Sequence, residues 1–434
     1  MTPAPRRIAY GWYVVAALFV VLTITSGLAF YNMSVYMSAL VETHGFPVSA
    51  VSIAIAVFFV SSGFGGLAAG HLLTRVDPRW TIVAGGVLGA LSLWLLGGVT
   101  ALWQLYLVYV LFGLGHACCA LVPATTLVTR WFTENRSIAL SVASTGLSLG
   151  GILLTPASAA LIGRVGLDAA TEVFALAWFL GVVPVTVLVI RQAPSTPVDH
   201  GSGGPARAAV QPAAPLDGWR YADALPSRWF IAITGAWVLV MLAQVGAISH
   251  LFNLASTRVD LATGATAVSL MATASILGRF LGGWLITRFD GRMFALVCIV
   301  LQGVALSALA FAEGRSGVLV GAVAFGATVG NLLMLQPLLL AEVFGARDYS
   351  RIYSLSQLVT TLGVASGPAL LGVLFDLLGG YEAAFLLAGT ASAVALVAMV
   401  VAGPFPDGPP ASEGETDEDT YVDANEDRMT EETT

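Results

Sequence analysis

The chain has 434 residues, of which 57% are hydrophobic and only 10% are charged, and its mean hydropathy is +0.84. Soluble domains carry about 25% charged residues, so this composition excludes an ordinary soluble protein and is typical of a helical membrane protein. The net charge of −7 comes from the segment after Pro404, where eleven acidic residues and one arginine give −10, and the rest of the chain carries +3.

Twelve apolar runs follow one another along the chain, each close to the ~20 residues that a helix needs to span a bilayer. Six lie before and six after residues 191–228, which are rich in Pro, Gly and Ala and are typical of a flexible linker. We therefore expect an all-α membrane protein with two six-helix bundles, residues 1–190 and 229–403, and a disordered acidic tail at 404–434. The expected spans are 12–37, 49–74, 80–99, 103–129, 137–163, 172–190, 229–254, 264–287, 293–312, 317–341, 351–376 and 382–402.

The arginines predict how the spans are oriented. All 19 basic residues are arginine, and fifteen of them lie at the amino end, in even-numbered loops or in the tail. Cytoplasmic loops carry an excess of basic residues, so we expect a multi-pass protein of the plasma (cytoplasmic) membrane with both termini and the linker in the cytoplasm. The odd-numbered loops hold Arg164, Arg258 and Arg315.

Two segments, Ser61–Arg79 and Ala274–Arg292, run from the second half of spans two and eight into the loops that follow, and they repeat each other with a constant offset of 213 residues. Parallel repeats of six spans indicate a transporter in which two bundles rock about a central site. We expect the repeated glycines and arginines to act in that conformational change. The matched pairs are Gly65 and Gly278, Gly70 and Gly283, Arg75 and Arg288, Asp77 and Asp290, and Arg79 and Arg292.

These residues carry a family resemblance. The segment GHLLTRVDPR resembles the short loop motif of the major facilitator superfamily at Gly70, Arg75 and Arg79. It departs from that motif at Thr74, and at Thr287 in the second half, where many members have an acidic residue. Three further stretches are similar to the branch of monocarboxylate transporters and oxalate–formate antiporters, and the resemblance as a whole runs from about Tyr10 to Ala402. The stretches are YGWYVVAALF in span one, RWFTENRSIALSVASTG entering span five and SILGRFLGG in span eight.

Arg279 is the one arginine deep inside an expected span. It lies nine residues before Arg288, about 14 Å along the helix, close to the middle of the bilayer. A charge at this depth is costly and normally faces water or a partner, yet Glu342 and Asp376 lie only near the ends of their spans. Arg279 therefore either binds an anion or has a structural hydrogen-bonding role. The resemblance favours the first, since in that branch an arginine at the matching place binds the substrate carboxylate.

Two charged groups of that branch are missing. Ser275 stands where proton-coupled relatives have an aspartate, and Gln357, Thr360 and Thr361 stand where the oxalate–formate antiporters have a second cation in span eleven. These departures argue against tight binding of a dianion and against ordinary proton symport. We expect facilitated diffusion or anion exchange.

Histidines and other polar residues inside the spans complete the predicted site. His116 lies near the middle of span four, and His250 lies towards the outer end of span seven on one helical face with Asn253. Each histidine could bind substrate, carry a proton or only pack through hydrogen bonds. The predicted binding residues are Arg279, His250, Asn253, His116, Tyr31, Asn32, Gln357 and Asn331.

Enzymatic function is not indicated, because the spans show neither a nucleophile–base arrangement nor a cluster of metal ligands. No GxxxxGK[ST] loop for a nucleotide occurs, and we expect no metal and no cofactor. The favoured function is a secondary transporter of a small organic anion, a monocarboxylate, working by alternating access. The alternatives are an exporter of amphipathic or drug-like compounds and a transporter-like solute sensor. The expected partners are the anion and the lipid bilayer; we expect no nucleic acid, and a monomer.

Overall fold

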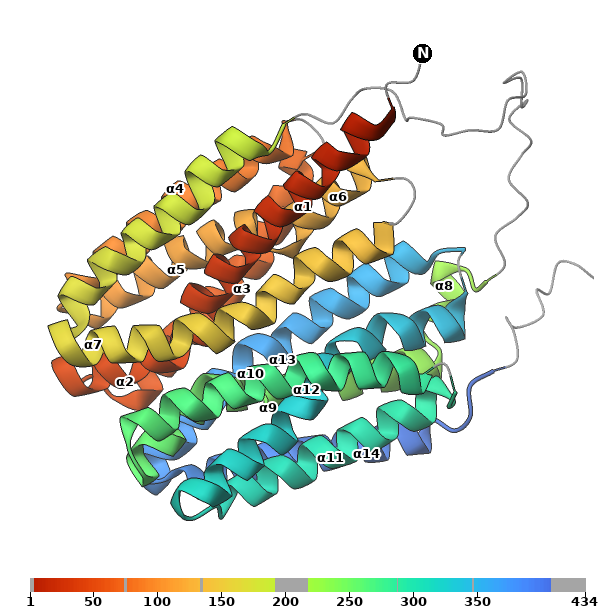
Figure 1. Ribbon diagram of the computed structural model, residues 1–434. Coiled ribbons are helices and arrows are strands. Elements are labelled where there is room, and N and C mark those ends of the chain that lie inside the picture. The colour runs from red at the N-terminus through yellow and green to blue at the C-terminus, as the bar shows by residue number, and fades with distance from the viewer. Residues whose placement is uncertain are drawn as a thin grey trace, which may run out of the picture.

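The computed structural model describes residues 4–73, 76–132, 136–191, 218–286, 288–345 and 347–406, which are nearly all helical. Two groups of long helices lie side by side, one from each half of the chain (Figure 1). Among the described residues, eleven helices are long and apolar enough to cross a membrane. One of them, α7 (Arg136–Val189), has 54 residues and contains two spans.

A reversal at Gly166 divides α7. A straight helix of 54 residues would be about 80 Å long, whereas the hydrocarbon core is about 30 Å thick. Gly166 has φ +83° and ψ 171°, a conformation that favours glycine, and it turns the chain back. Gly150 and Gly181, on either side of the reversal, pack against the neighbouring residues Thr23 and Ile24. The two arms of α7 are therefore separate spans, and the expected twelve-helix fold is confirmed.

Local irregularities interrupt two spans of the first half. Span one contains a π-helical turn, η1, between its two α-helices, and span four is broken at Ala120, where the backbone is extended. The remaining spans of this half are uninterrupted helices up to α7. The elements are α1 (Ala4–Thr25), η1 (Ser26–Tyr31), α2 (Met33–His44), α3 (Val48–Leu73), α4 (Pro78–Gly97), α5 (Leu102–Cys119) and α6 (Leu121–Trp131).

The second half includes the end of the expected linker. The backbone N–H of Trp219 donates to the carbonyl of Phe344 (2.9 Å), and that of Tyr221 donates to the carboxylate of Asp348 (2.8 Å). Residues 218–227 thus dock on this half, while linker residues 192–217 and tail residues 407–434 lie outside the described residues. The elements are α8 (Tyr221–Ala224), α9 (Arg228–Arg258), α10 (Leu261–Ile286), α11 (Gly291–Ala310), α12 (Gly314–Phe344), α13 (Tyr349–Leu378) and α14 (Tyr381–Val401).

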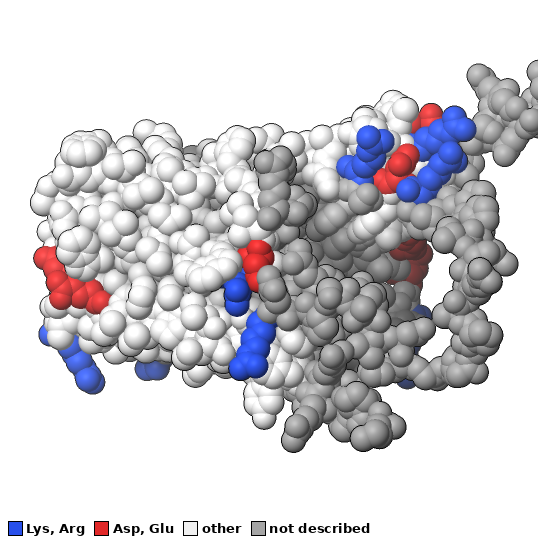
Figure 2. All heavy atoms as spheres, turned by 90° about the horizontal axis from the view of Figure 1, so that it is seen from above, with Lys and Arg blue, Asp and Glu red and all other residues white. Residues whose placement is uncertain are grey.

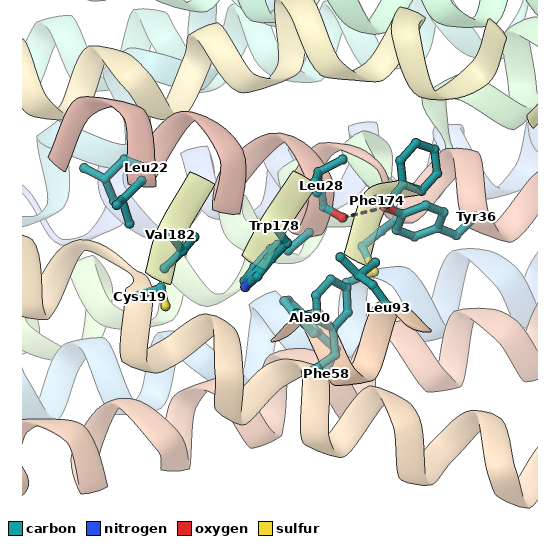
Figure 3. Close-up of a cluster of buried hydrophobic side chains, with 14 of the residues drawn as sticks. Leu22, Leu28, Tyr36, Phe58, Ala90, Leu93, Cys119, Phe174, Trp178 and Val182 are labelled. Atoms are coloured by element: carbon teal, nitrogen blue, oxygen red, sulfur yellow. Dashed lines mark hydrogen bonds between the residues drawn. The ribbon is translucent and has the colours of Figure 1, made fainter. Parts of the chain in front are cut away.

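Aromatic and aliphatic side chains fill the interior of the first half (Figure 3). Trp178 is fully buried against Gly89, which has no Cβ to displace the indole ring. The hydroxyl of Tyr36 donates to the carbonyl of Leu28 (2.8 Å), a residue of the π-helical turn. Because no water is present at this depth to satisfy polar groups, this bond stabilises the irregular turn.

The outer surface suits contact with lipid. In the part of Figure 2 that is not grey, most residues are uncharged, and the charged side chains form a few separate groups. Large apolar residues are exposed on the helices, among them Leu188 (72%) and Val320 (70%). We call the two ends of the molecule the odd-loop side and the even-loop side. The odd-loop side holds residues 45–47, 98–101, 166, 259–260, 311–313 and 379–380, and the arginines predict that it faces outward.

Candidate functional site

Close packing between α10 and α12 fixes the position of Arg279. A Cβ on Gly330 of α12 would overlap the carbonyl oxygen of Ser275 and lie 3.2 Å from the Cβ of Arg279. Gly278 packs in the same way against the backbone of Ala327. Small residues let membrane helices approach closely, and here they leave no room for a long side chain between the two helices. The Cβ of Arg279 lies at this contact, so the backbone of Gly330 limits how the long side chain can leave α10.

The guanidinium of Arg279 has no ion-pair partner among the residues that the structure describes. The residue lies seven positions before the end of α10, about 10 Å inside the helix, and it is half-buried. Its Nε is buried without a hydrogen-bond partner, and it forms no ion pair with any described residue. An unpaired cation inside a membrane is costly, so its free donors are available to an anion.

Tyr31, from the other half of the chain, lies near Arg279. Its hydroxyl is close enough to the guanidinium for an electrostatic interaction and lies beside Ser148 of α7. Its ring lies on Gly151, where a Cβ would be 2.8 Å from the ring atoms. Tyr31 is the last residue of the π-helical turn, and such turns occur frequently at functional sites. The sequence does not indicate Ser148 as a site residue, because only the fold places it beside Tyr31.

His250 and Asn253 belong to a separate cluster near the odd-loop side. His250 is fully buried, with Nε2 3.0 Å from the carbonyl of Pro368 and Nδ1 3.4 Å from the hydroxyl of Tyr381. Nε2 also lies 3.3 Å from the hydroxyl of Ser52, in the other half of the chain. The Asn253 side chain is buried and lies beside Tyr381. None of these contacts involves Arg279, so the structure does not bring the two clusters together.

His116 lies inside the first half, on α5, and its side chain contacts α3. Its Nδ1 is 3.3 Å from the hydroxyl of Ser62, and its ring packs on Phe58 with centroids 5.3 Å apart. Span four breaks three residues later, after Cys119. These contacts are typical of a packing residue and do not connect His116 to Arg279.

The other three predicted binding residues occupy different environments. Asn32 is buried in the first half and donates to Ser158 (2.6 Å). Asn331 donates to the carbonyl of Ala327 (3.0 Å) and lies against Gly282 in the contact between α12 and α10. Gln357 is exposed on α13. Asn32 and Asn331 thus have helix-packing contacts.

The loop motif of the first half caps a helix. The Asp77 carboxylate accepts a hydrogen bond from the backbone N–H of Arg79 (3.0 Å) and pairs with its guanidinium (3.3 Å) at the start of α4. Its repeat, Asp290, caps α11 by accepting from Met293 N–H (2.8 Å). The aspartates therefore stabilise helix N-termini. Arg75 lies outside the described residues.

The motif arginines of the second half bind aromatic and carbonyl groups. The Arg288 guanidinium lies 4.3 Å from the ring centroid of Trp284, and Arg292 donates to the carbonyl of Met399 in α14 (3.1 Å). A Cβ added to Gly283 would have no atom within 4 Å. The matching glycine of the first half, Gly70, lies near the end of α3. Arg292, in the first turn of α11, thereby joins α11 to α14.

An apolar groove of about 1090 Å³ lies between α10, α11 and α12. Gly278 and Asn331 contribute to its lining, together with exposed residues such as Leu301 and Val320. Arg279 does not line it. The groove therefore opens on a different face of α10 from the one that carries the guanidinium.

Comparisons with known proteins agree with this architecture. A sequence model of the Major Facilitator Superfamily matches residues 19–258 and 230–426. Monocarboxylate transporter 13 of Bos taurus is 26% identical over 387 residues, which cover 88% of this chain and 86% of that protein. Agnestins efflux protein AgnL12 of Paecilomyces divaricatus is 26% identical over 272 residues, covering 62% and 58%. A crystal structure of a mutant of the nucleoside transporter NupG has a TM-score of 0.71 at 12% identity, covering 90% of this chain and 100% of that one.

Proposed function

The chain belongs to the Major Facilitator Superfamily and is a multi-pass membrane transporter, and on this basis we propose that it carries a small organic anion. The substrate class we propose is a monocarboxylate, moved by alternating access between two sides of the membrane. The resemblance to monocarboxylate transporters supports this proposal, as does the similarity to the bovine monocarboxylate transporter 13.

The unpaired guanidinium of Arg279 is the observation that carries the proposal. Its donors form a planar fork that matches the two oxygens of a carboxylate, and a charge-assisted bond of this kind is stronger than one between neutral groups. The Tyr31 hydroxyl, close to the guanidinium, adds a second polar group from the other half. A carboxylate bound here would contact both halves at once.

A single cation favours a monoanion. The other arginines of the chain lie near the ends of the spans or outside them, so a second carboxylate would find no counter-charge beside Arg279. Gln357, at the position of the missing second cation, is neutral and exposed. Burying an uncompensated carboxylate is costly, and this cost disfavours dianions.

We place the protein in the plasma membrane with both termini in the cytoplasm, following its arginines. The second candidate function is export of amphipathic compounds. The name of the efflux relative from Paecilomyces divaricatus and the apolar groove of about 1090 Å³ favour it. Export of this kind would use apolar lining rather than the Arg279 guanidinium.

Counterflow in proteoliposomes distinguishes the two functions. Vesicles with purified protein are loaded in turn with short monocarboxylates, dicarboxylates, neutral sugars or amphipathic cations, and uptake of the labelled compound is followed. We expect counterflow with monocarboxylates and its loss in Arg279→Gln. Counterflow with amphipathic cations alone, unaffected by Arg279→Gln, would instead support the exporter.

A further inference from the structure

The contact between the two halves near the odd-loop side contains a polar cluster that the proposed substrate site does not use. We propose that His250 and Asp376 form a latch that holds the two halves together on the odd-loop side and must break when the transporter opens there. The proposal rests on the alternating-access part of the proposed function and not on the identity of the substrate. We define the latch as Ser49, Ser52, His250, Pro368, Gly372, Asp376 and Tyr381.

The hydrogen bonds of His250 fix its protonation pattern. The carbonyl of Pro368 can only accept, so Nε2 carries the hydrogen and donates to it over 3.0 Å. The Ser52 hydroxyl donates to the carbonyl of Val48 (2.7 Å), which leaves its oxygen free to accept from the same N–H over 3.3 Å. Nδ1 then accepts from the Tyr381 hydroxyl (3.4 Å). Neutral His250 thus satisfies both nitrogens and joins the halves through Ser52.

Asp376 makes the second bond between the halves. Its carboxylate accepts from the backbone N–H of Ser49 over 2.7 Å. Ser49 lies in the first turn of α3, where backbone N–H groups have no partner within the helix and the helix dipole favours a negative charge. An acidic residue of α13, in one half, therefore caps a helix of the other half.

The spacing along α13 makes this contact continuous. Pro368, Gly372 and Asp376 are four residues apart and share one face of the helix. Gly372 lies against the Ser52 side chain, which a Cβ at this position would overlap. Ser49 and Ser52 share the facing side of α3, so the polar contacts lie where the two helices approach most closely. Opening on the odd-loop side requires α3 and α13 to separate here.

Cysteine labelling measures that opening without any substrate. In a protein with Cys118, Cys119 and Cys298 replaced by alanine, Ala159→Cys serves as the reporter. Ala159 lies in α7, seven residues before Gly166, and packs on buried residues that belong mostly to the second half. An impermeant maleimide is applied to the odd-loop side of oriented vesicles, and the labelling rate reports how often that side opens.

Removing the latch bonds should speed this labelling. His250→Leu loses all three hydrogen bonds of the ring, and we expect labelling to become roughly five- to thirtyfold faster. His250→Gln keeps an amide donor near the position of Nε2 and should stay within about twofold of the parent. The matched control is Gln302→Leu. Gln302 is equally buried but donates to Val240 and Ser392 of its own half, so its loss should not change the labelling rate.

Ser52→Ala and Asp376→Ala are milder changes that keep the test valid if His250→Leu does not reach the membrane. Each removes one bond between the halves and should accelerate labelling roughly two- to tenfold. Unchanged labelling in every latch variant, or equal acceleration in Gln302→Leu, would overturn the proposal. Counterflow of the parent protein, measured in parallel, reports separately on the proposed function.

Discussion

The hydroxyl of Tyr31 and the guanidinium of Arg279 belong to opposite halves of the chain, yet they lie close enough to interact electrostatically. Tyr31 ends the π-helical turn of span one, and the Cβ of Arg279 lies beside Gly330 of α12. A rocking motion of the halves would change the distance between these two groups. A ligand held by both would therefore respond to that motion.

Tyr31→Phe tests the contribution of the hydroxyl. The change keeps the ring on Gly151 and removes one neutral hydrogen-bonding group, which is worth about 0.5–1.5 kcal/mol. We expect the half-saturation concentration for the transported anion in counterflow to rise about two- to tenfold. Tyr10→Phe is the control, because the Tyr10 hydroxyl donates to the carbonyl of Val189 (2.8 Å) within one half. It should lower stability and leave the half-saturation concentration unchanged; equal effects of the two changes would contradict the assignment.

Gly330→Ala tests the packing that positions Arg279. The added Cβ would overlap the carbonyl oxygen of Ser275, and overpacking of this kind costs about 1–3 kcal/mol. We expect a lower melting temperature and slower transport. Gly235→Ala is the matched control, since Gly235 lies inside α9, two turns from its start, and a Cβ there would have no atom within 4 Å. It should raise stability by up to about 1 kcal/mol. A Gly330→Ala protein as stable and active as the parent would show that α10 and α12 have room to separate.

The apolar runs predicted the number of spans, because the bilayer imposes nearly the same length on each helix. They did not predict the π-helical turn at Ser26–Tyr31, since its backbone is set by contacts such as that of Gly27 with Gly150. The docking of residues 218–227 was also missed. Trp219 and Tyr221 bind backbone and carboxylate groups more than 120 residues away, which no local pattern reveals.

The predicted site separates into different environments for a similar reason. The depth of Arg279 follows from counting residues along one helix, so the sequence could indicate it. The position of His250 relative to Ser52, or of Tyr31 relative to Ser148, depends on how helices from distant parts of the chain pack. A polar residue in a span can face a ligand, another helix or the other half, and its sequence neighbours do not distinguish these cases.

Coupling to protons is the third prediction. Position 275, one helical turn before Arg279, is a serine and offers no carboxylate that could carry a proton. Ser275 is buried, and its hydroxyl has no hydrogen-bond partner among the described residues. We expect anion counterflow to proceed without a proton gradient. Transport measured with and without an imposed gradient, in the parent and in a variant lacking His116 and His250, checks this. Strong dependence on the gradient that survives both histidine replacements would mean that another group carries protons.

Topology is the fourth prediction. The arginines predict a cytoplasmic linker and cytoplasmic termini. Reporter fusions at His200 and at the end of the chain, both outside the described residues, should be active only with a reporter that works in the cytoplasm. A fusion after Gly45, in the first odd-numbered loop, should show the opposite pattern. A fusion at His200 that is active on the outer side would contradict the orientation.

The most direct test of the account is the affinity of purified Arg279→Gln protein for the anion that counterflow identifies. A charge-assisted contact is worth about 1.5–3 kcal/mol, so its loss should weaken binding roughly tenfold to a hundredfold. Folding should be preserved, because the change removes a costly charge from the membrane. Arg279→Lys keeps the charge but loses the planar fork, and its transport should also fall sharply. Binding at least tenfold weaker in a well-folded Arg279→Gln protein is the predicted result. An unchanged affinity would contradict the account and mean that the guanidinium is structural.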